Sequence, residues 1–146
     1  MTINTTNVEQ AKRLIKQSKE KPIIVQAQDD VFNRKLLEYG KFDILLDIEA
    51  GNRKDKLKQA DSGFNHVLAV IAAKNHVALG IDLAAIVSLP KKEKARRLAR
   101  IKQNLALCRK AKTKIKMLNA HDAKAAQSLL ISLGASTQQA KDAMHF

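Results

Sequence analysis

Residues 61–83 read Asp-Ser-Gly-Phe-Asn-His-Val-Leu-Ala-Val-Ile-Ala-Ala-Lys-Asn-His-Val-Ala-Leu-Gly-Ile-Asp-Leu. Asp61 or Ser62 is suited to cap a helix that ends at Asn75. This helix is apolar nearly all round, which is typical of a helix buried by neighbours on several sides. Residues 77–81 are too short for a helix and predict a strand covered on both faces in a parallel sheet. The stretch therefore indicates the interior of an α/β fold.

Patterns of strand and helix alternate over the rest of the chain. The polar residues 1–6 predict a frayed end. We expect strands at residues 23–25, 42–48, 77–81 and 114–118, the last nearer an edge, and helices at residues 7–17, 29–39, 91–112, 122–133 and 137–146. Residues 84–89 fit either a short helix or an extended link. Such alternation predicts right-handed βαβ units and a parallel sheet. A closed barrel of this type needs about eight strands, so the predicted fold is α/β with an incomplete, TIM-barrel-like sheet of about four strands.

Length and composition set limits on the class of protein. The 146 residues suit one domain covering residues 1–146. No apolar stretch approaches the ~18 residues of a membrane span, and the N-terminal residues are polar. We expect a soluble, cytoplasmic protein with no membrane partner. The one cysteine, Cys108, agrees with a reducing compartment and lies on an apolar stripe, which favours a buried structural thiol.

The charge is concentrated in the second half of the chain. Residues 1–73 hold 12 basic and 10 acidic residues, whereas residues 74–146 hold 15 and 4, within a formal net charge of +13. Such asymmetry indicates a polyanionic partner, because neutralising phosphates releases counterions. A solubilising charge is the alternative, but a solvated face normally mixes signs and so gains pairing. We therefore favour nucleic acid.

The candidate nucleic-acid contacts are the basic residues of the 91–116 segment and of a polar loop at residues 53–58. Few aromatic residues are available to stack on bases, so contacts to the backbone of structured RNA or DNA are expected rather than sequence-specific reading of bases. The outer face of the 91–112 helix should carry Arg96, Arg100, Gln103 and Lys110. The predicted RNA-binding residues are Arg53, Lys54, Lys91, Lys92, Lys94, Arg96, Arg97, Arg100, Arg109, Lys110, Lys112, Lys114 and Lys116.

Polar residues at the ends of the predicted strands offer an alternative. Parallel α/β folds place their sites at the carboxyl ends of strands. A small metal-dependent phosphoesterase could be built from the residues expected there, Gln26, Asp47, Glu49, Asp82, Asn119 and His121. Yet strand ends become polar in any case as the chain leaves the core. The five glycines form no phosphate-binding loop, and the four histidines show no metal-ligand spacing. No cofactor, metal site or catalytic residue is predicted.

Several motifs resemble a known family. Residues 61–68, Asp-Ser-Gly-Phe-Asn-His-Val-Leu, followed by residues 72–78, are similar to a signature of ribonuclease P protein component 3, a TIM-barrel-like subunit of archaeal and eukaryotic ribonuclease P. Supporting matches are residues 33–34, 42–45, 100–110, 130–134 and 140–141, so the resemblance covers about residues 22–143. Two features depart from the family. The additional βα units with which family members usually begin are missing, which suggests an N-terminally shortened member. Gln127-Ser128-Leu129 also stands in place of the family's Pro-Arg-Asp.

The resemblance implies a non-catalytic RNA-binding subunit. In that family the RNA cleaves precursor tRNA, and the protein pairs with a second small protein subunit to stabilise the RNA's catalytic fold. The implied partners are ribonuclease P RNA, precursor tRNA as the substrate of the holoenzyme and the second subunit, in a homodimer or heterotetramer.

Overall fold

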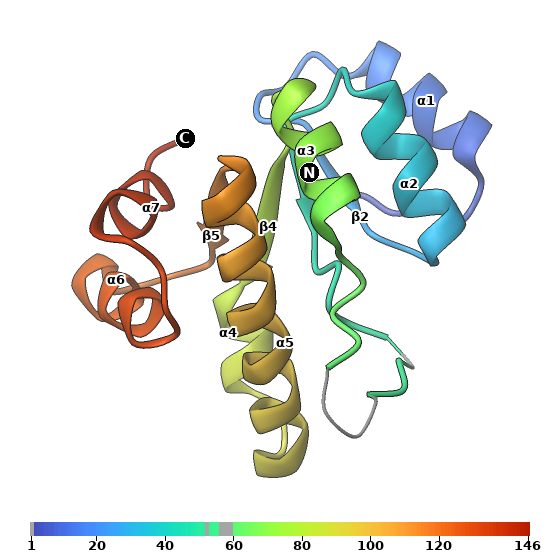
Figure 1. Ribbon diagram of the computed structural model, residues 1–146. Coiled ribbons are helices and arrows are strands. Elements are labelled where there is room, and N and C mark those ends of the chain that lie inside the picture. The colour runs from blue at the N-terminus through green and yellow to red at the C-terminus, as the bar shows by residue number, and fades with distance from the viewer. Residues whose placement is uncertain (1, 52, 56–59) are drawn as a thin grey trace.

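Five parallel strands form the centre of the protein in a computed structural model that describes residues 2–51, 53–55 and 60–146 (Figure 1). The strands lie in the sheet in their order along the chain, and each pairs in parallel with the next. They are β1 (Thr2–Ile3), β2 (Ile24–Gln26), β3 (Ile44–Leu46), β4 (Ala78–Asp82) and β5 (Ile115–Leu118). Successive strands that are also spatial neighbours, linked by helices, form one open section of a barrel-like sheet, which confirms the predicted fold class.

Helices fill the connections between strands at nearly the predicted positions. They are α1 (Val8–Gln17), α2 (Asp30–Tyr39), α3 (His66–Lys74), α4 (Leu83–Val87), α5 (Lys91–Ala111), α6 (Ala123–Ser132) and α7 (Thr137–Asp142). Side-chain caps define where several of them begin. Asp29 accepts a hydrogen bond from the Phe32 amide at 2.8 Å, and Asp122 accepts one from the Ala125 amide at 3.1 Å. Residues that favour caps therefore account for the helix boundaries.

The N-terminal residues differ from the prediction. Thr2 and Ile3 pair with Ile24 and Val25, so the described sheet has five strands and not four, and residues 2–3 are not frayed. A two-residue strand is too short to show periodicity in a sequence, which is why it was missed. Ile3 is nevertheless buried. At the other side of the sheet, β5 is an edge strand, as predicted.

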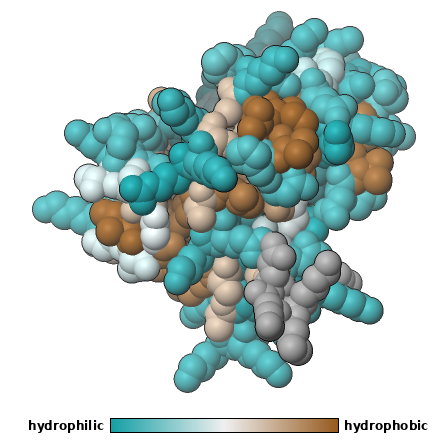
Figure 2. All heavy atoms as spheres, viewed as in Figure 1, coloured by the Kyte–Doolittle hydropathy of each residue, from teal (hydrophilic) through white to brown (hydrophobic). Residues whose placement is uncertain are grey.

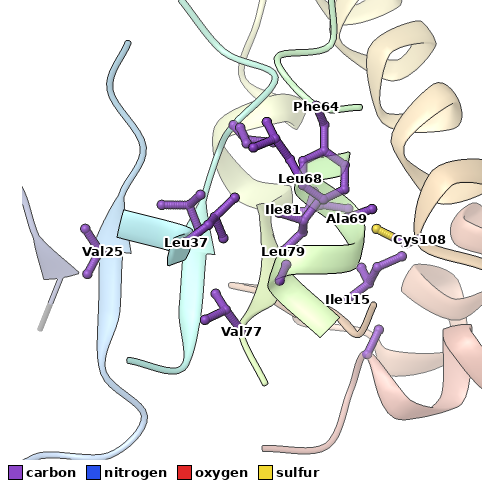
Figure 3. Packing of buried hydrophobic residues seen from close by; sticks show 14 of the residues in the cluster. Val25, Leu37, Phe64, Leu68, Ala69, Val77, Leu79, Ile81, Cys108 and Ile115 are labelled. Atoms are coloured by element: carbon purple, nitrogen blue, oxygen red, sulfur yellow. The ribbon is translucent and has the colours of Figure 1, made fainter. Parts of the chain in front are cut away.

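One contiguous apolar core joins the sheet to the helices that cover it. Leu79 and Ile81 of β4 and Ile115 of β5 lie beneath Leu68 of α3 and Cys108 of α5 (Figure 3), and all are buried. These strand residues alternate along the chain, as expected when every second side chain faces the helices. The core consequently fixes α3 and α5 against the same part of the sheet.

Helix α3 is less enclosed than its composition predicts. Val67 and Val70 are 54% and 46% exposed, and Figure 2 shows hydrophobic atoms at the surface over α3. The helix packs on the sheet (Figure 3) and contacts α2 and α5 on its flanks. The expectation of neighbours on several sides is therefore confirmed, but the outer side of the helix has no further layer in the described chain and its apolar side chains are exposed there. The predicted cap was wrong, because Asn65, and not Asp61 or Ser62, accepts the Leu68 amide at 2.9 Å.

Candidate nucleic-acid interface

Helix α5 presents a basic face to solvent. Ile101, Leu105 and Cys108 are buried on the side that faces the sheet. Lys102 is about three turns after Lys91, and Arg109 is about two turns after Lys102, which places the three exposed side chains in one row along the helix. The predicted RNA-binding residues that are exposed are Lys54, Lys91, Lys92, Arg96, Arg109, Lys110, Lys112 and Lys114, whereas Lys94 and Lys116 are half-buried. Lys56 and Lys58 of the predicted basic loop lie outside the described residues.

Arg100 points into the protein. Its side chain is 3% exposed. The guanidinium donates to the Glu49 carbonyl at 3.1 Å, to the Arg53 carbonyl at 2.9 Å and to the Asp55 carboxylate at 3.1 Å. The prediction that Arg100 lies on the outer face was therefore wrong. Its place on α5 borders the buried stripe, and a fork of several donors satisfies buried oxygen atoms that no apolar side chain could.

Arg97 lies between two carboxylates at the C-terminal end of β3. Its guanidinium is 2.9 Å from Glu49 and 3.5 Å from Asp47, and the side chain is 15% exposed. Burial raises the pKa of Glu49 and of Asp47 above their ordinary values, and the positive charge of Arg97 offsets part of this. Arg97 thus compensates charges that the fold has taken out of water.

Arg53 completes a set of three inward-facing arginines. Its side chain is 9% exposed and lies 2.8 Å from Asp30 and 3.4 Å from Asp61, and it donates to the Ile48 carbonyl at 3.2 Å. Asp55 is held by the Asp61 amide at 2.7 Å as well as by Arg100, and these contacts lower its pKa. Arg53, Arg97 and Arg100, which we call the inner arginines, therefore fasten the segment after β3 to α2 and α5.

The Asp-Ser-Gly-Phe-Asn-His motif is explained by the same segment. Gly63 has a φ of 73°, and a Cβ there would approach the Ile48 carbonyl oxygen to 2.5 Å, so only glycine fits. Ser62 is buried and bonds to two α5 residues: its hydroxyl accepts from Gln103 at 3.0 Å and its carbonyl from Asn104 at 3.3 Å. His66 is exposed in the first turn of α3. The motif is thus a turn held against α5 by hydrogen bonds, followed by the residue that caps α3.

The polar residues at the strand ends do come together in part. Asp47 accepts from the Asp82 amide at 3.4 Å, and Asn119 donates to the Asp82 carboxylate at 3.1 Å. The Gln26 side chain donates to the neighbouring Leu46 carbonyl at 3.4 Å, whereas His121 is exposed. The carboxylates of Asp47 and Glu49 both form ion pairs with Arg97. Within the described residues no group of three or more His, Cys, Asp or Glu side chains is arranged to hold a metal ion.

These inner contacts were not predicted from the sequence. The acids that receive Arg97 and Arg100 lie about 45 to 50 residues away along the chain, and those that receive Arg53 lie on either side of it at Asp30 and Asp61, so no regular helix or strand spacing reveals the pairs. One signal was available: acids in the first half of the chain nearly balance its bases, whereas the α5 region has one acid among many cations. From that asymmetry one would expect some cations of the α5 region to pair with acids from the first half of the chain.

The geometry defines an open, TIM-barrel-like α/β protein with a cationic helix on its surface. No family model matches the chain. One chain of a cryo-EM structure of archaeal ribonuclease P with mature tRNA shares this fold, with a TM-score of 0.77 and 24% identity, over 98% of this chain and 62% of that one. No helix in the described part of the chain combines the length and apolar character needed to cross a membrane.

Curated relatives identify the family that the motifs resemble. The chain is 31% identical over 93 residues to ribonuclease P protein component 3 of Methanococcus vannielii, covering 64% of this chain and 37% of that protein. Proteins of the same name from Methanocaldococcus jannaschii and Methanococcus maripaludis are 28% and 26% identical, over 88% and 77% of this chain. The chain is a homologue of these archaeal proteins, and the resemblance is confirmed. The matches span 58% of the M. jannaschii protein and 47% of the M. maripaludis protein, so the chain corresponds to part of their length.

Proposed function

We propose that this chain is a non-catalytic, RNA-binding protein subunit of ribonuclease P that supports the RNA-catalysed 5′ maturation of precursor tRNA. Residues 1–146 would act as one domain in the cytoplasm. Its partners would be ribonuclease P RNA, precursor tRNA as the substrate of the holoenzyme and a second small protein subunit. Homology to archaeal ribonuclease P protein component 3 supports this assignment.

The observation that carries the proposal is the division of basic residues on α5. The inner arginines are used within the fold, whereas Lys91, Lys92, Lys102, Arg109 and Lys110 face solvent. We call these five residues the outer cations. Glu93 is the one acid of α5, so the exposed row gains little from pairing within the helix. A surface of one sign along a straight helix suits the phosphates of a structured RNA.

The proposed interface leaves out three of the residues predicted from the sequence. The guanidinium groups of Arg53, Arg97 and Arg100 are themselves nearly buried and bond to groups of the fold. Bringing Arg97 to RNA would leave the buried Glu49 carboxylate unpaired, at a cost of several kcal/mol. Bringing Arg53 or Arg100 to RNA would leave main-chain carbonyls without their donor, at about 1–3 kcal/mol for each buried acceptor. The exposed residues Lys54, Arg96, Lys112 and Lys114 remain in the interface together with the outer cations.

The binding test replaces Lys91, Lys102 and Arg109 by alanine. Titration with a structured ribonuclease P RNA across a range of salt concentrations should give weaker binding and a salt slope smaller by about 2 to 3, since each lost phosphate contact removes about 0.7–0.9. The matched control replaces Lys16, Lys19 and Lys124, which are exposed elsewhere and remove the same charge. Equal losses in both variants would show that only net charge matters and would refute the proposed interface.

A second measurement tests the non-catalytic role. The isolated chain should show no turnover of precursor tRNA, while adding it to ribonuclease P RNA with the other protein subunits should raise cleavage. The triple variant should lower that stimulation at limiting protein and recover at higher protein concentration. Metal-dependent cleavage by the chain alone, lost in Asp47→Asn, would instead support the phosphoesterase alternative.

A further inference from the structure

A cavity of about 490 Å³ lies at the N-terminal ends of the strands. Pro22 precedes β2, Ile44 and Ala78 begin β3 and β4, and Lys114 precedes β5. The cavity is thus at the opposite end of the sheet from Asp47 and Asp82. Its size falls within the range of about 300–1,000 Å³ that small-molecule sites occupy.

The cavity combines apolar walls with a cationic rim. Its apolar lining comes from Pro22, Ile44, Ala72, Ala73, Val77, Ala78 and Phe146, and its basic lining from Lys21, His76, Lys112, Lys114 and Lys116. Asp43 is the one acid among the described lining residues. Its carboxylate already accepts the Ile23 amide at 2.6 Å and lies 3.8 Å from Lys21. The rim therefore has an excess of positive charge that its own acid leaves uncompensated.

Phe146 and Lys116 shape one side of the cavity. The Lys116 ammonium lies 5.7 Å from the centre of the Phe146 ring and donates to the carbonyls of Asp142 and His145. Burial and the neighbouring Lys114 lower the pKa of Lys116. Phe146 as a residue is 65% exposed, so its ring is accessible to a planar group. Lys112 and Lys114 are exposed beside it.

The cavity continues the basic surface of α5. Lys112 is the C-terminal cap of the helix, in a left-handed conformation, and lies two residues after the exposed Lys110. A strand whose phosphates lie along the outer cations would reach the cavity at the end of the helix. Structured RNAs present unpaired bases in loops and bulges, and proteins bind such bases on apolar and aromatic surfaces.

We propose that this cavity binds one unstacked nucleotide, with its base against the apolar wall and Phe146 and its phosphate at Lys112 and Lys114. The inference rests on the proposed RNA-binding function and adds a place where a single base leaves the RNA. A free nucleotide has the same chemistry, so the experiment separates the two sources.

The test follows backbone amide signals of the ¹⁵N-labelled chain during titration with AMP, a single-stranded oligoadenylate and inorganic phosphate. With the oligoadenylate, signals of Ala73, His76, Val77 and Phe146 should shift. The double variant Lys114→Ala/Phe146→Ala should bind it about tenfold more weakly, and the exposed control Lys124→Ala should bind it unchanged. Tighter binding of the oligoadenylate than of AMP assigns the site to an RNA strand, whereas equal binding assigns it to a free nucleotide.

Three outcomes would overturn the inference. One is that phosphate alone reproduces the shifts at the same concentration, because the apolar wall then contributes nothing. Another is that the double variant binds as well as the wild type. The third is that a ribonuclease P RNA shifts the outer cations of α5 while the oligoadenylate leaves the cavity signals unmoved, in which case the proposed function stands without this site. Absence of binding by every RNA would defeat both proposals together.

Discussion

Replacing Arg100 by alanine should destabilise the fold far more than it changes contact with RNA. The side chain is 3% exposed, and its removal leaves the Glu49 and Arg53 carbonyls without this donor and the Asp55 carboxylate with the Asp61 amide alone of its two hydrogen-bond donors. Each buried acceptor left without a donor costs about 1–3 kcal/mol, so the loss of both carbonyl contacts together with the ion pair should cost about 3–5 kcal/mol. With a urea dependence of about 2 kcal/mol per molar for a chain of this size, the unfolding midpoint should fall by roughly 2 M.

The assay is urea unfolding followed by circular dichroism, with Arg109→Ala as the matched control. Arg109 is exposed on the same helix, so its loss should change stability by less than about 0.5 kcal/mol while weakening RNA binding. Arg100→Lys keeps the charge but loses the planar fork, and its midpoint should fall between those of the wild type and the alanine variant. An unchanged midpoint for Arg100→Ala together with a loss of RNA affinity would refute the inward role.

Three further predictions concern the core, the buried acid and the motif glycine. Cys108 is buried and its pKa is raised to about 12 by desolvation, so at pH 8 a thiol reagent should label it only as fast as the protein opens; rapid labelling of the folded chain would contradict this. Burial raises the pKa of Glu49 above 4.5, so Glu49 binds a proton more readily in the folded protein than in the unfolded chain. The unfolding free energy of the wild type relative to that of Glu49→Gln should therefore rise as pH falls from neutrality through the folded pKa to 4.5. A difference between the two that is flat across this pH range would argue against the prediction. Gly63→Ala should lower the unfolding free energy by at least about 2 kcal/mol, because it adds a clash with the Ile48 carbonyl to the strain of a positive φ. Gly51 also has a positive φ but nothing within 4 Å of an added Cβ, so Gly51→Ala should cost about 1 kcal/mol. Equal thermal unfolding of the two variants would show that the clash is relieved.

Most of the fold could be predicted from local patterns. Apolar runs, caps such as Asp29 and Asp122, and the glycines that end helices place the secondary structure within a few residues. The two-residue β1 was missed because its pairing with β2 depends on a partner more than twenty residues away. The exposed side of α3 was missed for a related reason, since composition does not show how many neighbours a helix has.

The candidate interface was predicted only in part. Basic residues on α5 are visible in the sequence, but helix periodicity alone placed Arg100 on the wrong side. A buried arginine and an exposed arginine carry the same charge, and the positions of Glu49 and Asp55 in the fold decide that Arg100 turns inward. Long-range partners decide which cations remain available to a ligand.

The edge strand β5 has a consequence for how the protein behaves in concentrated solution. An unpaired edge is a template for the strand of another molecule, and proteins protect such edges with lysines or by covering them. Here the Met117 amide already donates to the Ala143 carbonyl at 2.9 Å, and Lys114 and Lys116 alternate with the buried residues of the strand. At the opposite edge, β1 offers only two residues for pairing. Neither edge of the sheet therefore readily pairs with a strand of another copy. Filament formation through the strands is disfavoured even though the barrel is not complete.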